Sequence, residues 1–296
     1  RPGAFLGSAL CQQHRRLLTV SADARTVASE VYEVERPQFC VMKRVDDILR
    51  AWYEHKAHMQ PCDVVSAYFH ACKLSRPRTA QQIERKHPQM AALVDHLTRV
   101  RDWRAADVAA ACMGTHYIQL RKPELTAVLS EAVLKKATKL GLVETTHVIT
   151  ALPTVAPKDK ALQGAVIHRC VTIADQLSAR QLSCVIGAAR RLLPTAARRE
   201  LVEHICRVAL KKAHIFSSAQ VCEVLVGLRK LGLSPSTPVV GAMAKRVPSI
   251  VLDLGTADLR ALAAAMRAFH ERDIAAIVDK QIVWKESGST SATGTV

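Results

Sequence analysis

The feature that most constrains the fold of this chain is a short motif that recurs six times, mostly at intervals of about 38 residues. In each copy an acid, an amide or a histidine precedes an apolar residue that opens an amphipathic run. The six apolar anchors are Val64, Val108, Val148, Leu182, Val221 and Leu259. Regular spacing of this length is typical of repeat proteins, in which each repeat is one supersecondary unit.

The last three copies also share an internal pattern. Apolar residues follow each anchor at i+3, i+4 and i+7, for example Val185, Ile186 and Ala189 after Leu182. These offsets place one apolar stripe on one face of a helix. Capping residues precede the runs at Ser178, Ser217 or Ser218, and Thr256. We therefore expect a first series of helices, the A helices, near 106–116, 143–152, 179–193, 218–231 and 256–270.

A second helical stretch, the B helix, lies between successive A helices. Pro123 stands where a first-turn proline is tolerated, Gly141 and Gly232 stand where helices stop, and Pro248 predicts a broken or short last B helix. The expected B helices are 88–100, 122–140, 158–176, 195–213 and 238–252. A single hairpin cannot bury both of its apolar faces, whereas stacked hairpins form one continuous core. The pattern predicts an all-α fold, an α-solenoid of about five to six stacked helical hairpins with a period of about 38 residues. The alternative is an irregular helical bundle with chance spacing.

Composition supports the all-α class. Hydrophobic residues make up 49% of the chain but aromatic residues only 4%, a mixture that suits closely packed Ala- and Leu-rich helices. Gly and Pro number 12 each, too few for an all-β protein with frequent turns. No run of about 18 apolar residues occurs, so we expect no transmembrane helix and no membrane partner.

The two ends of the chain differ from the repeats. We expect an N-terminal arm or targeting remnant at 1–40, a helical repeat domain at 41–285 and a disordered tail at 286–296. Before Asp23 the chain carries Arg1, Arg15 and Arg16 but no acid, a pattern shared by mitochondrial transit regions and by basic arms that contact RNA. A helix at 45–58 should pair with the first A helix, and 273–285 should form a last capping helix.

Positive charge is spread along the whole chain. Lys and Arg total 42 against 26 Asp and Glu, a net charge of +16, and each third of the chain is basic. Such a field attracts polyanions, of which nucleic acid is the commonest. Alternatively, the positive charge reflects the generally high pI of mitochondrial matrix proteins and not a nucleic-acid partner.

Basic residues also recur in register with the repeats. Arg190, Arg229 and Arg267 stand eight residues after their anchors, and Arg191 and Lys230 stand nine after. Equal repeat positions stack in a solenoid, so these residues predict a row of positive charge that contacts RNA phosphates. The full set of candidate RNA-binding residues is Arg190, Arg191, Arg198, Arg199, Lys211, Lys212, Arg229, Lys230, Lys245 and Arg246. The alternative is a solvated face whose cations stabilise helix C-termini.

Cysteine and histidine residues do not form a recognisable metal or disulfide pattern. The nine cysteines are odd in number and include no CxxC pair, which favours a reducing compartment. The segment from His55 through His58 to Cys62 could bring metal ligands together, but its spacing fits no usual structural zinc pattern.

No catalytic signature occurs in the sequence either. The chain contains no GxSxG, Walker loop, HExxH or GxGxxG motif. Trp52, Trp103 and Trp284 are too scattered to form a base-stacking platform and are interpreted as core residues or interface anchors. We therefore expect no enzyme activity, no cofactor, no metal and no small-molecule substrate.

The A-helix pattern, with its terminal Arg229-Lys230-Leu231-Gly232, resembles the heptatricopeptide-like repeats of organellar FAST-kinase-like, RAP-domain and octotricopeptide proteins over about residues 60–270. The chain lacks a RAP domain, the PPPEW signature and the base-reading positions of pentatricopeptide arrays, which speaks against sequence-specific RNA reading. The resemblance implies an α-solenoid subunit of a mitochondrial ribonucleoprotein in the matrix, foremost a mitochondrial ribosome component that binds RNA and neighbouring proteins. The alternatives are an accessory protein of an RNA editing or processing complex and a protein-only solenoid adaptor.

Overall fold

The computed structural model describes residues 37–76 and 78–290 of this chain. Within these residues the chain forms fifteen α-helices and five short 3₁₀ helices, and no β-strand. Helices account for 77% of the residues, which confirms the all-α class. None of the described helices is long and apolar enough to cross a membrane.

The described residues fall into two compact units, whereas a single domain over 41–285 was expected. Unit 1 is the described part of Arg1–Trp103 together with Tyr117–Leu120, and unit 2 is Arg104–His116 with the described part of Arg121–Val296. The division arises because the helices before Trp103 bury a core of their own around Trp52 and Tyr68, which are 2% and 0% exposed.

Unit 1 is built from four α-helices and one 3₁₀ turn: η1 (Phe39–Val41), α2 (Val45–His55), α3 (Pro61–Leu74), α4 (Ala80–Lys86) and α5 (Gln89–Thr98). The predicted helix at 45–58 is α2, and it packs against α3 as expected and also against α5. Phe39 is buried, so the last residues of the expected arm at 1–40 belong to unit 1. Residues 1–36 of that arm lie outside the described residues.

The short helix α4 was missed by the sequence analysis. It begins with a capping box, in which the Thr79 hydroxyl accepts from the Gln82 N–H and the Gln82 side chain accepts from the Thr79 N–H. This Thr-x-x-Gln pattern is a local signal of a helix start. The seven-residue length of α4 explains why it shows no clear repeat of apolar residues.

Unit 2 holds the remaining helices. They are α6 (Ala105–Tyr117), α7 (Pro123–Lys136), α8 (Leu142–Val155), α9 (Lys160–Ile173), α10 (Ala179–Ala189), α11 (Ala196–Lys211), α12 (Ser218–Lys230), α13 (Pro238–Ala244), α14 (Val247–Ile250), α15 (Thr256–Ala268) and α16 (Arg272–Thr290). The predicted A helices correspond to α6, α8, α10, α12 and α15, and Pro248 lies in the short α14 after the expected break.

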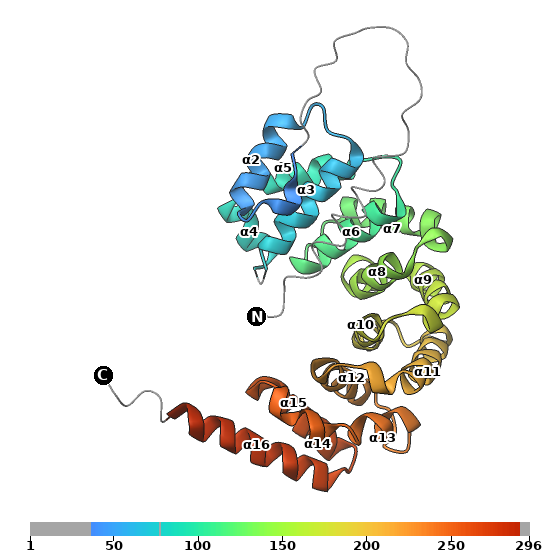
Figure 1. The fold of residues 1–296 in the computed structure, drawn as a ribbon. Helices are drawn as coiled ribbons and strands as arrows, with labels where there is room; N and C mark the ends of the chain where they lie inside the picture. The colour runs from blue at the N-terminus through green and yellow to red at the C-terminus, as the bar shows by residue number, and fades with distance from the viewer. Residues whose placement is uncertain (1–36, 77, 291–296) are drawn as a thin grey trace, which may run out of the picture. The chain divides into compact units, whose positions relative to one another are not determined.

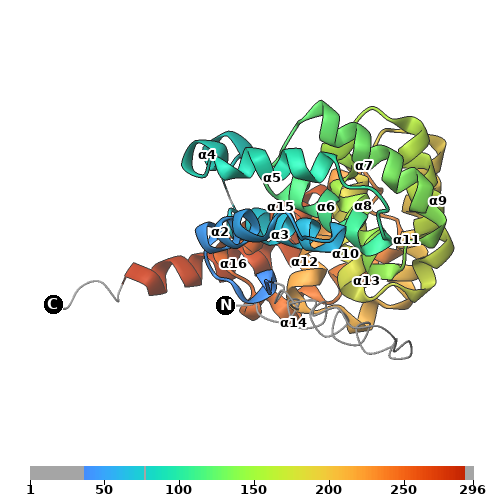
Figure 2. The same cartoon turned by 90° about the horizontal axis from the view of Figure 1, so that it is seen from above.

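The helices of unit 2 pack in two series. Each of α8, α10, α12 and α15 packs against the next, and α7, α9, α11 and α13 form a second series beside it. Figure 1 shows α8, α10 and α12 in one column with α9, α11 and α13 in another. Figure 2, turned by 90°, also places α9 and α11 on the outer side of α8 and α10.

In unit 2 a 3₁₀ turn ends each B helix and leads into the next A helix. These turns are η2 (Ala137–Lys139), η3 (Ala174–Gln176), η4 (Ala213–Ile215) and η5 (Val251–Asp253). After η3 and η4 the A helix starts in a capping box, Ser178 with Gln181 and Ser217 with Gln220. The expected cap at Thr256 is wrong by one residue, because Gly255 with its extended backbone takes the cap position of α15.

The apolar stripes of the A helices are buried as predicted. Val185, Leu225 and Leu262 are each 0% exposed. Helix α12 approaches α10 closely, since a Cβ built on Gly227 would lie 2.7 Å from the Cγ2 of Ile186. The small residue at this position allows the two helices to pack side by side.

The final helix, α16, packs along α15. Two ion pairs join them, Arg267 to Asp279 at 2.6 Å and Arg260 to Glu286 at 2.7 Å. A terminal helix at 273–285 was predicted, but α16 extends to Thr290, so the expectation of a structureless tail is wrong for 286–290. The ion pair of Glu286 anchors this end of the helix despite its polar composition. Residues 291–296 lie outside the described residues.

Candidate nucleic-acid interface

The ten candidate cations do not share one surface, because each hairpin of unit 2 is antiparallel. The A helices end at the edge where the B helices begin, and the B helices end at the opposite edge. Arg190, Arg191, Arg229 and Lys230 therefore lie at the first edge, while Lys211 and Lys212 lie at the second. Sequence register grouped Arg190, Arg191, Arg229 and Lys230 but could not show that Lys211 and Lys212 lie at the other edge.

The first edge carries two pairs of exposed cations at equivalent positions. Arg190 and Arg191 directly follow α10, and Arg229 and Lys230 end α12. All four are exposed, and no ion pair is formed by any of them within the described residues. Since α10 and α12 are packed neighbours, the helix ends that carry the two pairs are about 8–10 Å apart, the usual spacing between helix axes.

Arg191 is the most constrained of these cations. Its Nη2 donates to the backbone oxygen of Thr150 on α8 at 3.5 Å, so its side chain runs back along the preceding A helix. Partial burial, with a smaller contribution from the charge of Arg190, lowers the pKa of Arg191.

Two further cations extend this edge at the start of α11. Thr195 caps the helix by accepting from the Arg198 N–H, and Arg198 and Arg199 fill its first turn. The first turn of a helix carries a positive partial charge, so two arginines there raise the local potential further. Arg199 is exposed and Arg198 half-buried. We name the set Arg190, Arg191, Arg198, Arg199, Arg229 and Lys230 the basic edge.

Lys158, in the turn between α8 and α9, and Lys160, the first residue of α9, lie at the same edge and were not among the predicted residues. Both are exposed. They flank Asp159, whose carboxylate is occupied in capping α9 through the Leu162 N–H at 2.9 Å. In the sequence, the signal for these two residues is a pair of lysines directly after an A helix. That pair can be assigned to this edge only once the position of the turn is known.

Arg267 does not belong to the basic edge, although it shares the register of Arg190 and Arg229. Both oxygens of Asp279 on α16 accept hydrogen bonds from its Nη2, at 2.7 and 2.6 Å. An arginine that is already paired with a carboxylate offers little to a phosphate. The predicted row of positive charge therefore ends at α12.

Lys212 and Arg246, two of the predicted RNA-binding residues, donate hydrogen bonds to backbone oxygens of the preceding hairpin. The Lys212 ammonium donates to the backbone oxygens of Asp175 and Leu177, both at 2.7 Å, and Arg246 donates to the Ala213 oxygen at 2.6 Å. These carbonyls lie at or beside 3₁₀ turns that end B helices, where unpaired carbonyl groups need donors.

The same contact recurs at both ends of this series. Arg169 donates to the Leu140 oxygen at 2.8 Å, and Lys285 donates to the oxygens of Leu252 and Leu254 at 3.1 and 2.7 Å. Four successive hairpins thus use a cation to close the end of the B helix before them. Lys211 and Lys245 are exposed and make no such contact, so they remain as scattered cations away from the basic edge.

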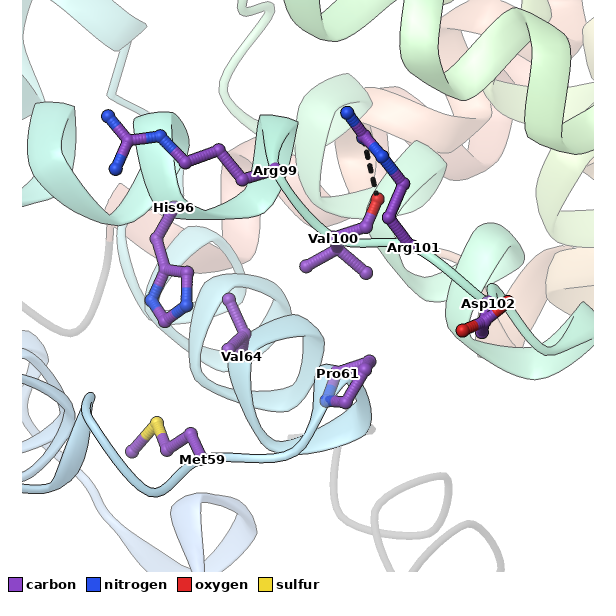
Figure 3. Close-up of a pocket in the computed structure, with 8 residues that line it drawn as sticks. All are labelled: Met59, Pro61, Val64, His96, Arg99, Val100, Arg101 and Asp102. Atoms are coloured by element: carbon purple, nitrogen blue, oxygen red, sulfur yellow. Dashed lines mark hydrogen bonds between the residues drawn. The ribbon is translucent and has the colours of Figure 1, made fainter.

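A pocket of about 370 Å³ in unit 1 offers no comparable site. Figure 3 shows Met59, Pro61 and Val64 on one side, with the side chains of Arg99 and Arg101 directed away from them. Arg101 donates to the backbone oxygens of Thr98 and Val100. Four of the eight lining residues are polar or charged, namely His96, Arg99, Arg101 and Asp102.

Burial shifts the pKa of several cysteine and histidine side chains in the described residues. Among the described residues, no three His, Cys, Asp or Glu side chains gather as a metal site. Burial raises the pKa of the Cys112 and Cys170 thiols to about 12, so both are protonated thiols in the core. Burial and the charge of Lys73 lower the pKa of His70 to about 4, which keeps its imidazole neutral.

Comparison with known proteins adds no family to this description. No protein-family model matches the chain, and a search of curated proteins finds no significant match.

Proposed function

We propose that this chain is a non-catalytic helical-repeat subunit of a mitochondrial ribonucleoprotein in the matrix, foremost a mitochondrial ribosome component. In this proposal the basic edge binds RNA phosphates, other surfaces bind neighbouring proteins, and no cofactor or small-molecule substrate takes part. The observation that carries the proposal is the basic edge itself, six Arg and Lys residues on two adjacent hairpins that form no ion pair within the described residues.

The arrangement of unit 2 supports an α-solenoid of about five to six hairpins with a period of about 38 residues. The A helices from α8 to α15 pack in chain order, and the 3₁₀ turns that end the B helices begin at regularly spaced positions, Ala137, Ala174, Ala213 and Val251. The recurring cation-to-carbonyl contacts join each hairpin to the one before it. Contacts restricted to neighbouring repeats are the property that defines solenoid proteins.

The chemistry of the basic edge favours the phosphate backbone over bases. Guanidinium groups bind phosphate oxygens with two parallel hydrogen bonds, and five of the six residues are arginines. A protein that neutralises phosphates releases counterions, which makes its affinity strongly dependent on salt. We therefore expect binding that depends on RNA charge and shape and is tolerant of sequence.

The resemblance to heptatricopeptide-like repeats is consistent with this proposal and also with its alternatives. An accessory protein of an RNA editing or processing complex would use the same edge for a different RNA. In a protein-only adaptor the basic edge would bind no RNA and would stay exposed to solvent.

A salt titration of RNA binding tests the proposal. Affinity for a structured RNA of generic sequence is measured over a series of salt concentrations for the wild type and for a variant with Arg190, Arg191, Arg229 and Lys230 changed to Gln. Loss of four phosphate contacts should flatten the logarithmic salt slope by about three units. The fold should persist, because exposed side chains contribute little to stability.

A matched control removes the same charge elsewhere in unit 2. Changing Lys139, Arg207, Lys211 and Lys245 to Gln also removes four exposed cations, but none of them lies on the basic edge. If the two quadruple variants had equal salt slopes, net charge alone would determine the salt dependence of RNA affinity. The basic edge would then not be the RNA-binding site. Weak RNA binding by the wild type would favour the adaptor. The RNA that co-purifies with the protein separates the ribosomal from the editing assembly.

A further inference from the structure

The cations at the edge where A helices end and B helices begin stand in two rows. One row lies at the ends of α10 and α12, and the other lies at the starts of α9 and α11. Figure 1 shows α10 and α12 in one column and α9 and α11 in the column beside it. We name Arg190, Arg191, Arg229 and Lys230 the A row, and Lys158, Lys160, Arg198 and Arg199 the B row. All of these side chains except that of Arg198 are exposed.

The packing of the helices sets the distance between the two rows. Helix α10 packs against α11 and α12, and α11 packs against α9. The axes of packed helices are about 8–10 Å apart, so the step along each row and the gap between the rows are both of that size. The two rows together form a broad patch of positive charge and not a single line.

Acidic side chains weaken this patch only in part. Asp159 lies between the two lysines of the B row, but its carboxylate accepts from the Leu162 N–H and caps α9. Glu200 and Glu203 follow Arg199 on α11 and are exposed, and neither forms an ion pair within the described residues. Even with all three acids counted, the eight cations of the two rows leave a net charge of +5.

The two rows offer no aromatic ring on which a base could stack. Phe216 is the one Phe, Tyr or Trp within residues 158–230, and it is 2% exposed and follows η4 at the opposite edge. Of the histidines in this stretch, His168 and His204 lie in the middle of helices and His214 lies in η4. Proteins that bind single strands without sequence preference stack successive bases on aromatic side chains. This patch is therefore suited to phosphates and not to unpaired bases.

We propose that the two rows bind double-stranded RNA, with one backbone of the A-form helix on the A row and the other on the B row. The major groove of A-form RNA is deep and narrow, so the two phosphate backbones approach each other across it. Two rows of cations separated by one helix spacing match two such backbones, whereas a single strand has one line of phosphates and would fill one row. This inference rests on the proposed function, RNA binding at the basic edge, and names the form of RNA that is bound.

Binding of the full chain to two RNAs of equal length tests the proposal. One RNA is a hairpin that folds into a continuous duplex, and the other is an unstructured single strand with the same number of nucleotides. At equal salt concentration the duplex should bind at least about 10-fold more tightly, because both rows then contact phosphates. Hydroxyl-radical cleavage of the bound duplex should show protected backbone on both strands.

Variants of the two rows separate the contacts to the two strands. The A-row variant is the quadruple change to Gln described above. The B-row variant combines Lys158→Gln, Lys160→Gln and Arg199→Gln, which are all at exposed positions and leave the half-buried Arg198 in place. Since each lost phosphate contact lowers the logarithmic salt slope by about 0.7–0.9, the slope for the duplex should fall by about three units in the A-row variant and about two in the B-row variant. The matched quadruple control away from the basic edge should keep the wild-type slope.

Three results would overturn the proposal. They are a single strand that binds as tightly as the duplex, a B-row variant with the wild-type salt slope for the duplex, and protection from hydroxyl radicals on one strand only. Each of these results is compatible with weaker RNA binding by the A-row variant, so RNA binding at the basic edge would stand. Failure of the proposed function has a different signature, in which the A-row variant binds both RNAs like the wild type, and both proposals then fail.

Discussion

Substituting Gly227 by Ala should destabilise unit 2, although Ala is the better helix former. Gly227 lies in α12, and a Cβ placed on it would be 2.7 Å from the Cγ2 of Ile186 on α10. Ordinary contacts between carbon atoms begin at about 3.5 Å, so the two helices would have to separate or Ile186 would have to move. Ile186 is 0% exposed and its β-branched side chain has little rotational freedom, so relief is costly.

Gly187 in α10 supplies a control that isolates this packing cost. A Cβ on Gly187 meets no atom within 4 Å, so Gly187→Ala should stabilise the protein by up to about 1 kcal/mol through helix propensity alone. Both variants make the same exchange inside a helix, and the propensity gain cancels in their difference. Overpacking typically costs about 1–3 kcal/mol, so Gly227→Ala should be less stable than Gly187→Ala by that amount.

Urea unfolding followed by far-UV circular dichroism measures both variants, with the midpoint and slope compared with those of the wild type. A double-mutant cycle with Ile186→Ala adds a second test, since removing the Cγ2 atom should abolish the cost of Gly227→Ala. If Gly227→Ala proves as stable as Gly187→Ala, then α10 and α12 are not packed at the spacing described, and the reasoning about their close approach is refuted.

Three further predictions concern the core, the repeat junctions and pH. Leu225→Ala should cost about 2–5 kcal/mol in urea unfolding because Leu225 is fully buried; a change below about 1 kcal/mol would contradict its place in the core. Lys212→Met should cost about 1–2 kcal/mol because two carbonyls lose their donor, whereas Lys211→Met, at an exposed site, should stay within about 0.5 kcal/mol. Burial lowers the pKa of His147 from 6.5 to about 4, so the unfolded chain takes up a proton first and stability should fall as pH drops from 6.5 towards 4. Unfolding midpoints of His147→Gln should lose part of that pH dependence, and an unchanged profile would show that His147 is not the source.

The sequence by itself predicted most of the helices, though not α4, and the buried faces of the A helices. Leu182, Val221 and Leu259 each open a run of apolar residues with helical spacing. Such a run depends only on residues close together in the chain, and any apolar neighbour in the fold can bury it. It also placed Arg190 and Arg229 correctly at exposed helix ends, because a residue just past the last apolar position of a helix lies at its edge. The capping serines and the break near Pro248 followed from the same short-range chemistry.

The tertiary structure alone decided which cations are available. Lys212 and Arg246 resemble the cations of the basic edge in sequence, yet they donate to carbonyl groups 33 to 37 residues away in the preceding hairpin. Arg267 shares the register of Arg190 but is paired with Asp279, because α16 packs along α15. The outcome for each cation depends on the acceptor that folding brings beside it. The sequence does not show which acceptor lies beside each cation, so only the packed helices show which positive charges remain for a partner.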